Sequence, residues 1–306
     1  MVKANPLVSV VIPNYNHAIF LEERIQSVLN QTYTNYEIII LDDNSTDESL
    51  NIINKFRNNP KVSKIIINDH NGKSPFKQWY KGISHANGDI IWLAESDDTC
   101  EPEFLATLVP IYLMNNCAFA FARSKYIDEN GKMLGVTQKK CKSSGTWSGK
   151  KCIFKYLSAR CFVVNASSAI FSKAKALEIN DQFVSFKSSG DWLFWIEMAE
   201  IGNVSFVSDT LNMYRIYSGN TTKKTSETGI MDIENHKIYN YLLSRNLLSK
   251  YKAFSIKKRA LYKVKYKRSY DKAIKDDILQ MWNPNFAYRS ITLMSRIFHL
   301  VANKSK

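Results

Sequence analysis

The sequence lacks features that mark several common protein classes. It contains no uninterrupted apolar run of about 18 residues, so no segment is predicted to span a membrane. The stretch MVKANPLVSVVIP turns polar too early for a secretory signal peptide. The five cysteines form no CxxC pair, which favours reduced thiols over disulfides or a metal site. Together these features predict a cytoplasmic protein.

Acidic residues are scarce only in the last part of the chain. The net charge is +14, and residues 241–306 hold 16 Lys and Arg against 3 Asp and Glu. The preceding 240 residues are nearly balanced. A basic terminal segment predicts an anionic partner, which would be lipid headgroups or nucleic acid. No nucleic-acid-binding motif accompanies the charge, so nucleic acid is not expected as a partner.

Strands and helices alternate over the first 122 residues. Apolar runs predict strands, and residues with helical spacing follow each of the first four. Strands that are apolar throughout are typical of a mainly parallel sheet covered on both faces, so the predicted fold class is α/β. The strands are expected at 7–12, 36–41, 64–68, 90–94 and 117–122.

Polar residues follow each of the first four predicted strands. In a parallel sheet these residues lie at one edge, where such folds bind ligands outside the carboxyl ends of the strands. The sequence therefore predicts a binding site there. The segments concerned are Asn14-Tyr15-Asn16, Asp42-Asp43-Asn44, Asn68-Asp69-His70 and Glu95-Ser96-Asp97-Asp98.

Three carboxylates close to one another follow the fourth strand. Glycine-rich phosphate loops of the forms GxGxxG and GxxxxGK[ST] are absent, so a bound diphosphate would need another neutralising group. Mg²⁺ or Mn²⁺ held by Glu95, Asp97 and Asp98 would supply it, because these ions prefer oxygen ligands. The alternative is that Asp97 and Asp98 cap the following helix or are solvated.

Two further acidic positions lie where polar chemistry is expected. Asp42 and Asp43 follow the second strand, and a carboxylate there can accept hydrogen bonds from a ribose or a base. Asp191, in the stretch SSGDW, lies beside aromatic residues at a predicted helix start and is a candidate general base. For both sites the alternative is capping of the helix that follows.

The order of these motifs resembles family 2 glycosyltransferases of the GT-A type. The resemblance covers about residues 7–220. It implies transfer of a sugar from a nucleotide-diphosphate donor, most often a UDP-sugar, to a glycan or lipid-linked glycan acceptor with inversion. An inactive relative that binds the sugar nucleotide as a scaffold is the alternative. The motifs are VSVVIPNYN, SVLNQTYTNYEIIILDDNSTDES, NGKSPFKQWYKGISHANGDIIWLAESDD, GDW and LNMYRIYSGNTT.

The resemblance also implies roles for individual residues. ESDD takes the place of the family's metal-binding DxD motif, with Glu95 in place of the usual first Asp. Asp191 is implied as the catalytic base. Tyr217 stands where many relatives have His, which suggests that Arg215 and Tyr217 donate to phosphate. The donor-binding residues implied are Pro13, Tyr15, Asn16, Asp42, Asp43, Lys77, Ser96, Asp97, Arg215 and Tyr217.

Two regions are expected in the chain. Residues 1–230 form the predicted catalytic domain, with a nucleotide-binding half at about 1–122 and an acceptor half at about 123–230. Residues 231–306 form a helical basic region. In its last stretch, apolar residues recur at the spacing of a helix: Ala287, Ile291, Met294, Phe298 and Val301. This pattern predicts peripheral attachment to the inner face of the cell membrane, and the alternative is a helical extension packed on the domain.

Overall fold

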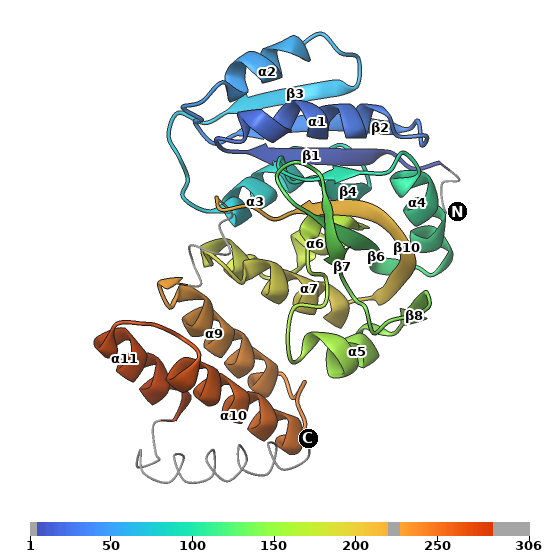
Figure 1. Cartoon of the computed structure of the whole chain (residues 1–306). Coiled ribbons are helices and arrows are strands. Elements are labelled where there is room, and N and C mark those ends of the chain that lie inside the picture. Colours follow the sequence, from blue (N-terminus) through green and yellow to red (C-terminus); the bar gives the residue numbers. More distant parts are fainter. Residues whose placement is uncertain (1–4, 220–226, 284–306) are drawn as a thin grey trace. The chain divides into compact units, whose positions relative to one another are not determined.

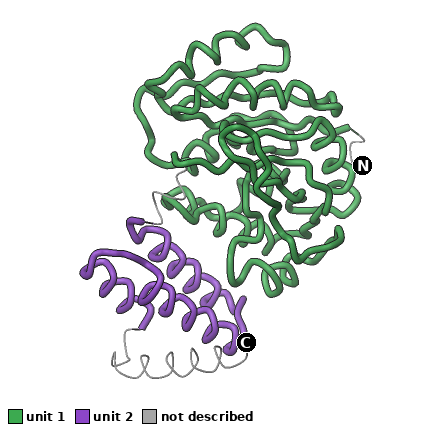
Figure 2. Tube along the Cα trace, viewed as in Figure 1, with its two compact units in different colours: residues 1–220 green, residues 221–306 purple. Residues whose placement is uncertain are grey.

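A computed structural model describes residues 5–219 and 227–283. Contacts along the chain divide it into two compact units, Met1–Asn220 (unit 1) and Thr221–Lys306 (unit 2), which Figure 2 distinguishes by colour. Every strand that the structure describes lies in unit 1, and the described part of unit 2 is helical.

Unit 1 is built around one mixed sheet with the strand order β3-β2-β1-β4-β9-β6-β10-β5 (Figure 1). The first four strands of this order pair in parallel. Every residue of β1, β2 and β4 is buried, as expected for strands covered on both faces. The bounds are β1 Val8–Asn14, β2 Tyr36–Asp42, β3 Val62–Ile67 and β4 Ile90–Leu93.

Four helices connect and cover these strands. One face of α1 is apolar, and its Leu21, Ile25 and Val28 join a core with residues of β1, β2 and β4. Trp92 of β4 stacks on Phe104 of α4 with ring centroids 4.5 Å apart, which fixes α4 against the sheet. The helices are α1 Ala18–Leu29, α2 Ser49–Lys55, α3 Pro75–His85 and α4 Phe104–Met114.

The second half of the sheet contains antiparallel pairs. Strand β9 runs antiparallel to both β4 and β6, and β10 runs parallel to β6. The strands are β5 Thr99–Cys100, β6 Cys117–Ile127, β7 Met133–Val136, β8 Gly145–Trp147, β9 Ala169–Ser172 and β10 Asn203–Arg215. The helical segments between them are α5 Gly149–Cys152, a π-helical turn at Ile153–Leu157, short 3₁₀ turns at Ala166–Ser168 and Asp181–Ser185, α6 Lys173–Glu178 and α7 Gly190–Glu200.

Three helices make up the described part of unit 2: α9 Ile230–Ser244, α10 Lys250–Tyr266 and α11 Lys272–Trp282. Asp232 of α9 is buried and holds the connection between α10 and α11, because it accepts hydrogen bonds from Arg268 Nε at 3.0 Å and Tyr270 Oη at 2.6 Å. Ser249 and Asp271 cap α10 and α11 through their side chains. Within the described ranges, no helix is both long and apolar enough to cross a bilayer.

The predicted fold class is confirmed, with two differences in detail. The sheet is mixed, because β9 enters it antiparallel beside β4. The 13-residue strand β10 was not expected. The predicted amphipathic stretch at 287–301 lies outside the described residues.

Candidate active site

The carboxyl ends of β1, β2 and β4 lie side by side at one edge of the sheet. Asn14 pairs with Asp42, and Val11 pairs with Leu93, in the parallel register. The backbone N–H of Asn68, just after β3, donates to the Asp42 carbonyl at 2.9 Å. The polar segments that follow these four strands are therefore neighbours, which is the arrangement that the sequence predicts.

Asp42 is fully buried and holds the turn that follows β2. Its Oδ1 accepts a hydrogen bond from the Ser45 N–H at 2.8 Å. Its Oδ2 accepts from Asn14 Nδ2 at 2.8 Å and from Ser45 Oγ at 2.7 Å. Asn16 extends this link, because its Oδ1 accepts from the Thr46 N–H at 2.7 Å. These contacts give Asp42 a positioning role, and its contact with a donor stays a prediction.

Asp43 lies at the centre of a second polar cluster. Its Oδ1 accepts from Asn68 Nδ2 at 2.6 Å, from Gln78 Nε2 at 2.6 Å and from the Gly72 N–H at 2.9 Å. The α3 residue Lys77 is exposed, and its stem lies near Gly72. No ion pair holds the Lys77 ammonium within the described ranges, so it is available to a phosphate beside Asp43.

The segment after β1 presents one open aromatic side chain. Pro13 is buried within the strand, whereas Tyr15 is 42% exposed. Asn16 has a φ of 54°, a left-handed conformation that Asn tolerates better than most residues and that turns the chain sharply into α1. An exposed ring at this edge can stack against a nucleotide base.

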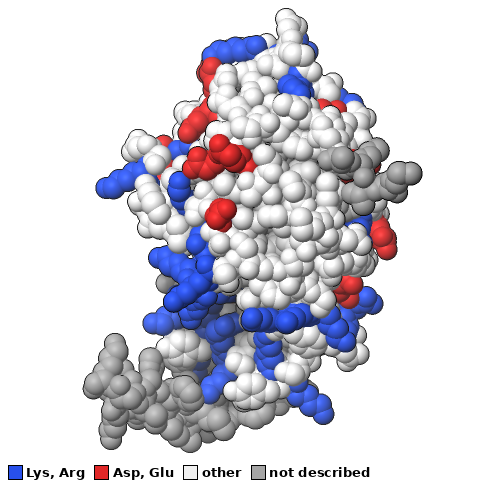
Figure 3. All heavy atoms as spheres, turned by 90° about the vertical axis from the view of Figure 1, so that its right-hand side faces the viewer, with Lys and Arg blue, Asp and Glu red and all other residues white. Residues whose placement is uncertain are grey.

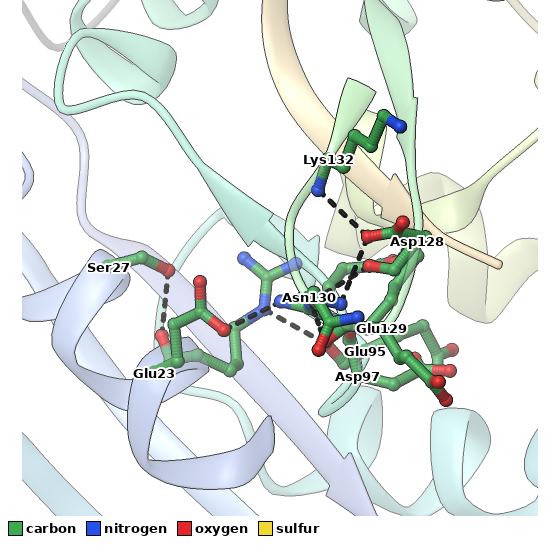
Figure 4. A network of polar contacts seen from close by, with 11 residues as sticks. Glu23, Ser27, Glu95, Asp97, Asp128, Glu129, Asn130 and Lys132 are labelled. Atoms are coloured by element: carbon green, nitrogen blue, oxygen red, sulfur yellow. Dashed lines mark hydrogen bonds and ion pairs between the residues drawn. The ribbon is translucent and has the colours of Figure 1, made fainter. Parts of the chain in front are cut away.

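The three carboxylates after β4 differ in their surroundings. Asp98 is almost completely buried, and its oxygens accept from the Arg215 N–H at 3.0 Å, Asn165 Nδ2 at 2.8 Å and Ser167 Oγ at 2.6 Å. Glu95 and Asp97 are only partly buried. Figure 4 shows these two side chains close to each other. The two partly exposed carboxylates, rather than Asp98, have oxygens available to a cation.

Burial and mutual repulsion disfavour the charged form of this cluster. Burial, followed by the charge of Asp97, raises the pKa of Glu95 to about 8. The same two causes raise the pKa of Asp98 to about 6, and burial raises the pKa of Asp97. A divalent cation at these oxygens would reverse the shifts, because it stabilises the ionised carboxylates.

Arg215, at the end of β10, is buried and makes several hydrogen bonds around this cluster. Its Nε donates to the Asp97 carbonyl at 2.9 Å, and its Nη2 donates to Glu23 Oε2 at 2.6 Å. Its Nη1 donates to the carbonyls of Asp128 and Glu129 at 3.2 and 3.1 Å. Arg215 thereby fixes the backbone that carries the acids. The guanidinium is 2% exposed, so this positioning role is favoured over contact with phosphate.

A second buried arginine, Arg24 of α1, lies behind the acids. Its Nε donates to the Glu95 carbonyl at 2.9 Å, and its guanidinium carbon lies 5.7 Å from the centroid of the Trp92 ring. Both terminal nitrogens are buried without a hydrogen-bond partner in the described structure. Its positive charge lowers the pKa of Asp97 and Asp98, against the larger effect of burial. Arg24 therefore offsets part of the repulsion among the acids.

Tyr217 reaches the cluster from the chain beyond β10. Its hydroxyl hydrogen-bonds to the Asp97 carboxylate, and it lies 2.8 Å from His17 Nε2. The other ring nitrogen of His17 lies 2.8 Å from Ser96 Oγ. Burial, followed by the charge of Asp97, raises the pKa of Tyr217, so the hydroxyl stays protonated and able to donate. His17 and Tyr217 thus fix Asp97 and Ser96 through a continuous set of hydrogen bonds.

Asp191 lies in the first turn of α7. Its Oδ2 accepts a weak hydrogen bond from Cys161 Sγ at 3.8 Å. The preceding residue must be Gly190, because a Cβ there would lie 2.7 Å from Phe183 O and from the Phe76 ring. The Phe76 ring packs against the Trp79 ring, with the ring centroids 5.1 Å apart.

Trp79 connects the start of α7 with the acids. Its Nε1 donates to Glu95 Oε1 at 2.7 Å, so Phe76 and Trp79 form a continuous contact from Gly190 to Glu95. Two packed rings thus separate the first residue of α7 from Glu95.

The carboxylates suit a cation that keeps several non-protein ligands. No three His, Cys, Asp or Glu side chains in residues 5–219 and 227–283 form a group that could hold a metal. Mg²⁺ typically takes one or two carboxylates and completes its shell with substrate phosphates and water. Glu95 and Asp97, partly exposed and with raised pKa values, fit that requirement.

Several residues of this site were not predicted. Arg24 had a signal, because it interrupts the apolar face that Leu21, Ile25 and Val28 form on the first helix, where a charge is unexpected. His17 and Trp79 gave no such signal, because their partners lie 79 and 16 residues away in the sequence. Only the folded chain brings them to the acids.

Comparison with known proteins gives the family of the chain. The family model described as glycosyl transferase family 2 matches residues 9–170. An uncharacterized glycosyltransferase of Rickettsia bellii is 28% identical over 249 residues, which cover 81% of this chain and 34% of that protein. The chondroitin synthase of Pasteurella multocida is 32% identical over 131 residues, covering 42% of this chain and 13% of that protein.

A solved structure shares the fold. The crystal structure of residues 1–349 of S. aureus TarS in complex with UDP-GlcNAc aligns with a TM-score of 0.60 and 19% identity, and the alignment covers 90% of this chain and 71% of that one. The chain spans about a third to a half of the length of the first curated relatives that it matches. Because the family model matches more than half of its residues, the chain belongs to glycosyl transferase family 2.

Proposed function

We propose that the chain transfers a sugar from a nucleotide-diphosphate donor to an acceptor hydroxyl, with inversion at the anomeric carbon. The observation that carries the proposal is the partly exposed pair Glu95 and Asp97. It lies at the ligand-binding edge of the sheet, with raised pKa values and a buried arginine behind it. A cation would favour the ionised form of this pair, and a cation beside Asp43 and Lys77 suits a nucleotide diphosphate. The alternative function is an inactive scaffold that binds the sugar nucleotide.

The donor's nucleoside would lie at the ends of β1 and β2. The exposed ring of Tyr15 is the surface for the base. Asp43 is 4% exposed, and the acceptor for base or ribose hydrogen bonds would be its Oδ2, which accepts only a 3.1 Å contact from the Gly72 N–H in the described structure. The Asp43 carboxylate is already oriented by Asn68, Gly72 and Gln78, so it would not have to reorganise on binding. A UDP-sugar is the proposed donor, in keeping with the fold shared with the UDP-GlcNAc complex of TarS.

The diphosphate would lie at the acids and Lys77. Glu95 and Asp97 would hold Mg²⁺ or Mn²⁺, which would neutralise the departing nucleoside diphosphate. Asp98 and Arg215 would keep the backbone of Asp97 fixed from behind. Trp79 would orient Glu95 by donating to its Oε1.

Asp191 is the proposed general base. It would accept the proton of the acceptor hydroxyl while that oxygen forms a bond to the anomeric carbon and the bond to the diphosphate oxygen breaks. Its place in the first turn of α7 stabilises the carboxylate, because the helix N-terminus carries partial positive charge. The proton would thus end on Asp191, and the electron pair of the broken bond would leave with the diphosphate.

The acceptor would be a glycan or lipid-linked glycan of a bacterial cell-surface polysaccharide, a proposal supported by the relative named chondroitin synthase. Attachment to the inner face of the membrane is proposed for unit 2. Its helix α10 exposes Tyr251 to 84% and Phe254 to 64% among many lysines, which is typical of an interfacial helix. Flotation with phosphatidylglycerol vesicles tests this attachment, and a protein that stays at the bottom of the gradient would contradict it.

A thermal-shift screen of nucleotide sugars with and without Mn²⁺ tests the donor proposal. A donor at a hundred times its dissociation constant should stabilise the protein by about 2.7 kcal/mol. We expect stabilisation by one nucleotide class that needs the metal and is lost in Asp97→Ala. Hydrolysis of that donor then separates the enzyme from a scaffold that only binds it. If no nucleotide sugar stabilises the protein, the proposed function is wrong.

A further inference from the structure

Unit 1 contains a cavity that the roles above do not use. It has a volume of about 760 Å³, within the range of roughly 300–1,000 Å³ typical of ligand sites. Its wall comes from the connection between β7 and β8, from the π-helical turn at Ile153–Leu157 and from residues 160–164. All of these segments lie between the nucleotide half and α7 in the sequence, within the region predicted to bind the acceptor.

The charge of the cavity wall has one sign. Five cationic residues line it and no Asp or Glu does. No ion pair neutralises any of the five within residues 5–219 and 227–283. All five side chains are exposed, and the Lys155 ammonium lies 5.0 Å from the centroid of the Tyr156 ring, so the charge of the wall stands beside its aromatic part. Figure 3 shows that Lys and Arg side chains gather in groups on one face of the molecule, with Asp and Glu in smaller separate groups. The cations of the cavity are Lys139, Lys140, Lys142, Lys155 and Arg160.

Aromatic rings form another part of the wall. Tyr156 stacks on Phe162 with centroids 4.2 Å apart and planes at 9°, and Trp147 packs against Tyr156 at 4.8 Å. The rings hold one another in place, and Trp147 and Tyr156 keep part of their surface exposed. The C–H face of a sugar ring packs well on such a surface, because both are apolar and flat. Cations beside fixed aromatic rings suit a ligand that alternates sugar rings with negative groups.

One residue of the cavity wall contacts the proposed catalytic base, which does not itself line the cavity. Cys161 lines it, and the Cys161 thiol donates to Asp191 Oδ2 at 3.8 Å. Burial and the charge of Asp191 raise the pKa of this thiol, so it remains neutral and adds no negative charge to the wall. A saccharide in the cavity would therefore lie one residue away from the carboxylate that is proposed to take the acceptor's proton.

We propose that this cavity is the acceptor subsite and that it selects an anionic saccharide, with phosphate or carboxylate groups on the cations and a sugar ring on Trp147 and Tyr156. The inference rests on the proposed function, since it names the acceptor of the same reaction. A neutral glycan would form no ion pair with the five cations, so the cavity should bind an anionic saccharide more tightly than a neutral one.

Binding of defined oligosaccharides tests this without any need for turnover. Isothermal titration of the full chain would use tetragalacturonic acid as the carboxylate probe, a glycerol phosphate oligomer as the phosphate probe and maltotetraose as the neutral control. We expect an anionic probe to bind more tightly than maltotetraose, with an affinity that falls as salt rises. The probe that binds more tightly identifies the anionic group.

The variant Lys155→Gln/Arg160→Gln should weaken that binding about tenfold, since it removes two contacts between partly solvated charges. The matched control is Lys150→Gln/Lys151→Gln, which removes two exposed lysines of α5 that do not line the cavity. Equal loss in both variants, or no preference for anionic probes, would overturn the inference.

Hydrolysis of the donor, measured on the same proteins, keeps the two proposals apart. If the donor is hydrolysed and anionic saccharides show no preference, the cavity proposal alone fails. If anionic saccharides bind but no donor is bound or hydrolysed, the proposed function fails, and the acceptor role of the cavity fails with it.

Discussion

Replacing Asp98 should destabilise the protein, whereas replacing its neighbour Asp97 should mainly affect function. Asp98→Ala leaves three buried donors unpaired: the Arg215 N–H, Asn165 Nδ2 and Ser167 Oγ. Each unsatisfied donor costs about 1–3 kcal/mol. Relief of the repulsion from Asp97 offsets part of this cost, which leaves a net loss of about 3 kcal/mol.

Urea unfolding and thermal melting would measure the loss. For a unit of this size, about 3 kcal/mol corresponds to a decrease of roughly 6–12 °C in Tm. Asp97→Ala is the matched control, since its carboxylate is partly exposed and should cost less than about 1 kcal/mol. If Asp98→Ala lost less than 1 kcal/mol, or if Asp97→Ala were the more destabilised of the two, the assignment of Asp98 to structure and Asp97 to the cation would be refuted.

Three further predictions concern the site. Without metal, Tm should fall as pH rises from about 4.5 to about 8, because folded Glu95 holds a proton over this range that the unfolded chain has released. Mn²⁺ should make Tm less dependent on pH, because it favours the ionised form of Glu95. A metal-free Tm that rises over this range would contradict the raised pKa of Glu95. Tyr217→Phe removes the hydroxyl that hydrogen-bonds to Asp97, and should weaken Mn²⁺-dependent donor binding about 10–100-fold with little loss of stability. Titration calorimetry measures this affinity, and an unchanged value would exclude a role of Tyr217 in positioning Asp97. Asp191→Asn should leave donor affinity unchanged and lower kcat by about 10²–10⁴-fold, and full transfer activity would show that Asp191 is not the base.

The parallel half of the sheet could be predicted from the sequence because its strands are apolar throughout. Stretches such as YEIIIL and IIWLA have no other stable place than a core covered on both faces. Their order then implied where the polar residues would gather, since parallel strands end at the same edge. Strand β10 was not predicted, because a polar stretch between Val207 and Asn212 interrupts the apolar pattern of a strand. In the structure, register shifts in the pairing of β10 with β6 fall in the same stretch.

The candidate acids could be found from the sequence, but the division of roles among them could not. Glu95, Asp97 and Asp98 look alike in a row of letters. The donors that saturate Asp98 come from residues 67 to 117 positions further along the chain, and only the fold brings them together. The sequence pointed to all three as cation ligands, whereas partial exposure favours Glu95 and Asp97.

Metal-dependent donor hydrolysis is the most direct test of the proposed site. The purified chain would be incubated with the nucleotide sugar that stabilises it most, with Mn²⁺ or with EDTA, and release of the nucleoside diphosphate would be followed. We expect release with Mn²⁺, none with EDTA, and a loss of at least about 10²-fold in Asp97→Ala, while Lys150→Gln/Lys151→Gln behaves as the unaltered chain. Equal release by Asp97→Ala, or release that is unaffected by EDTA, would contradict a cation at Glu95 and Asp97.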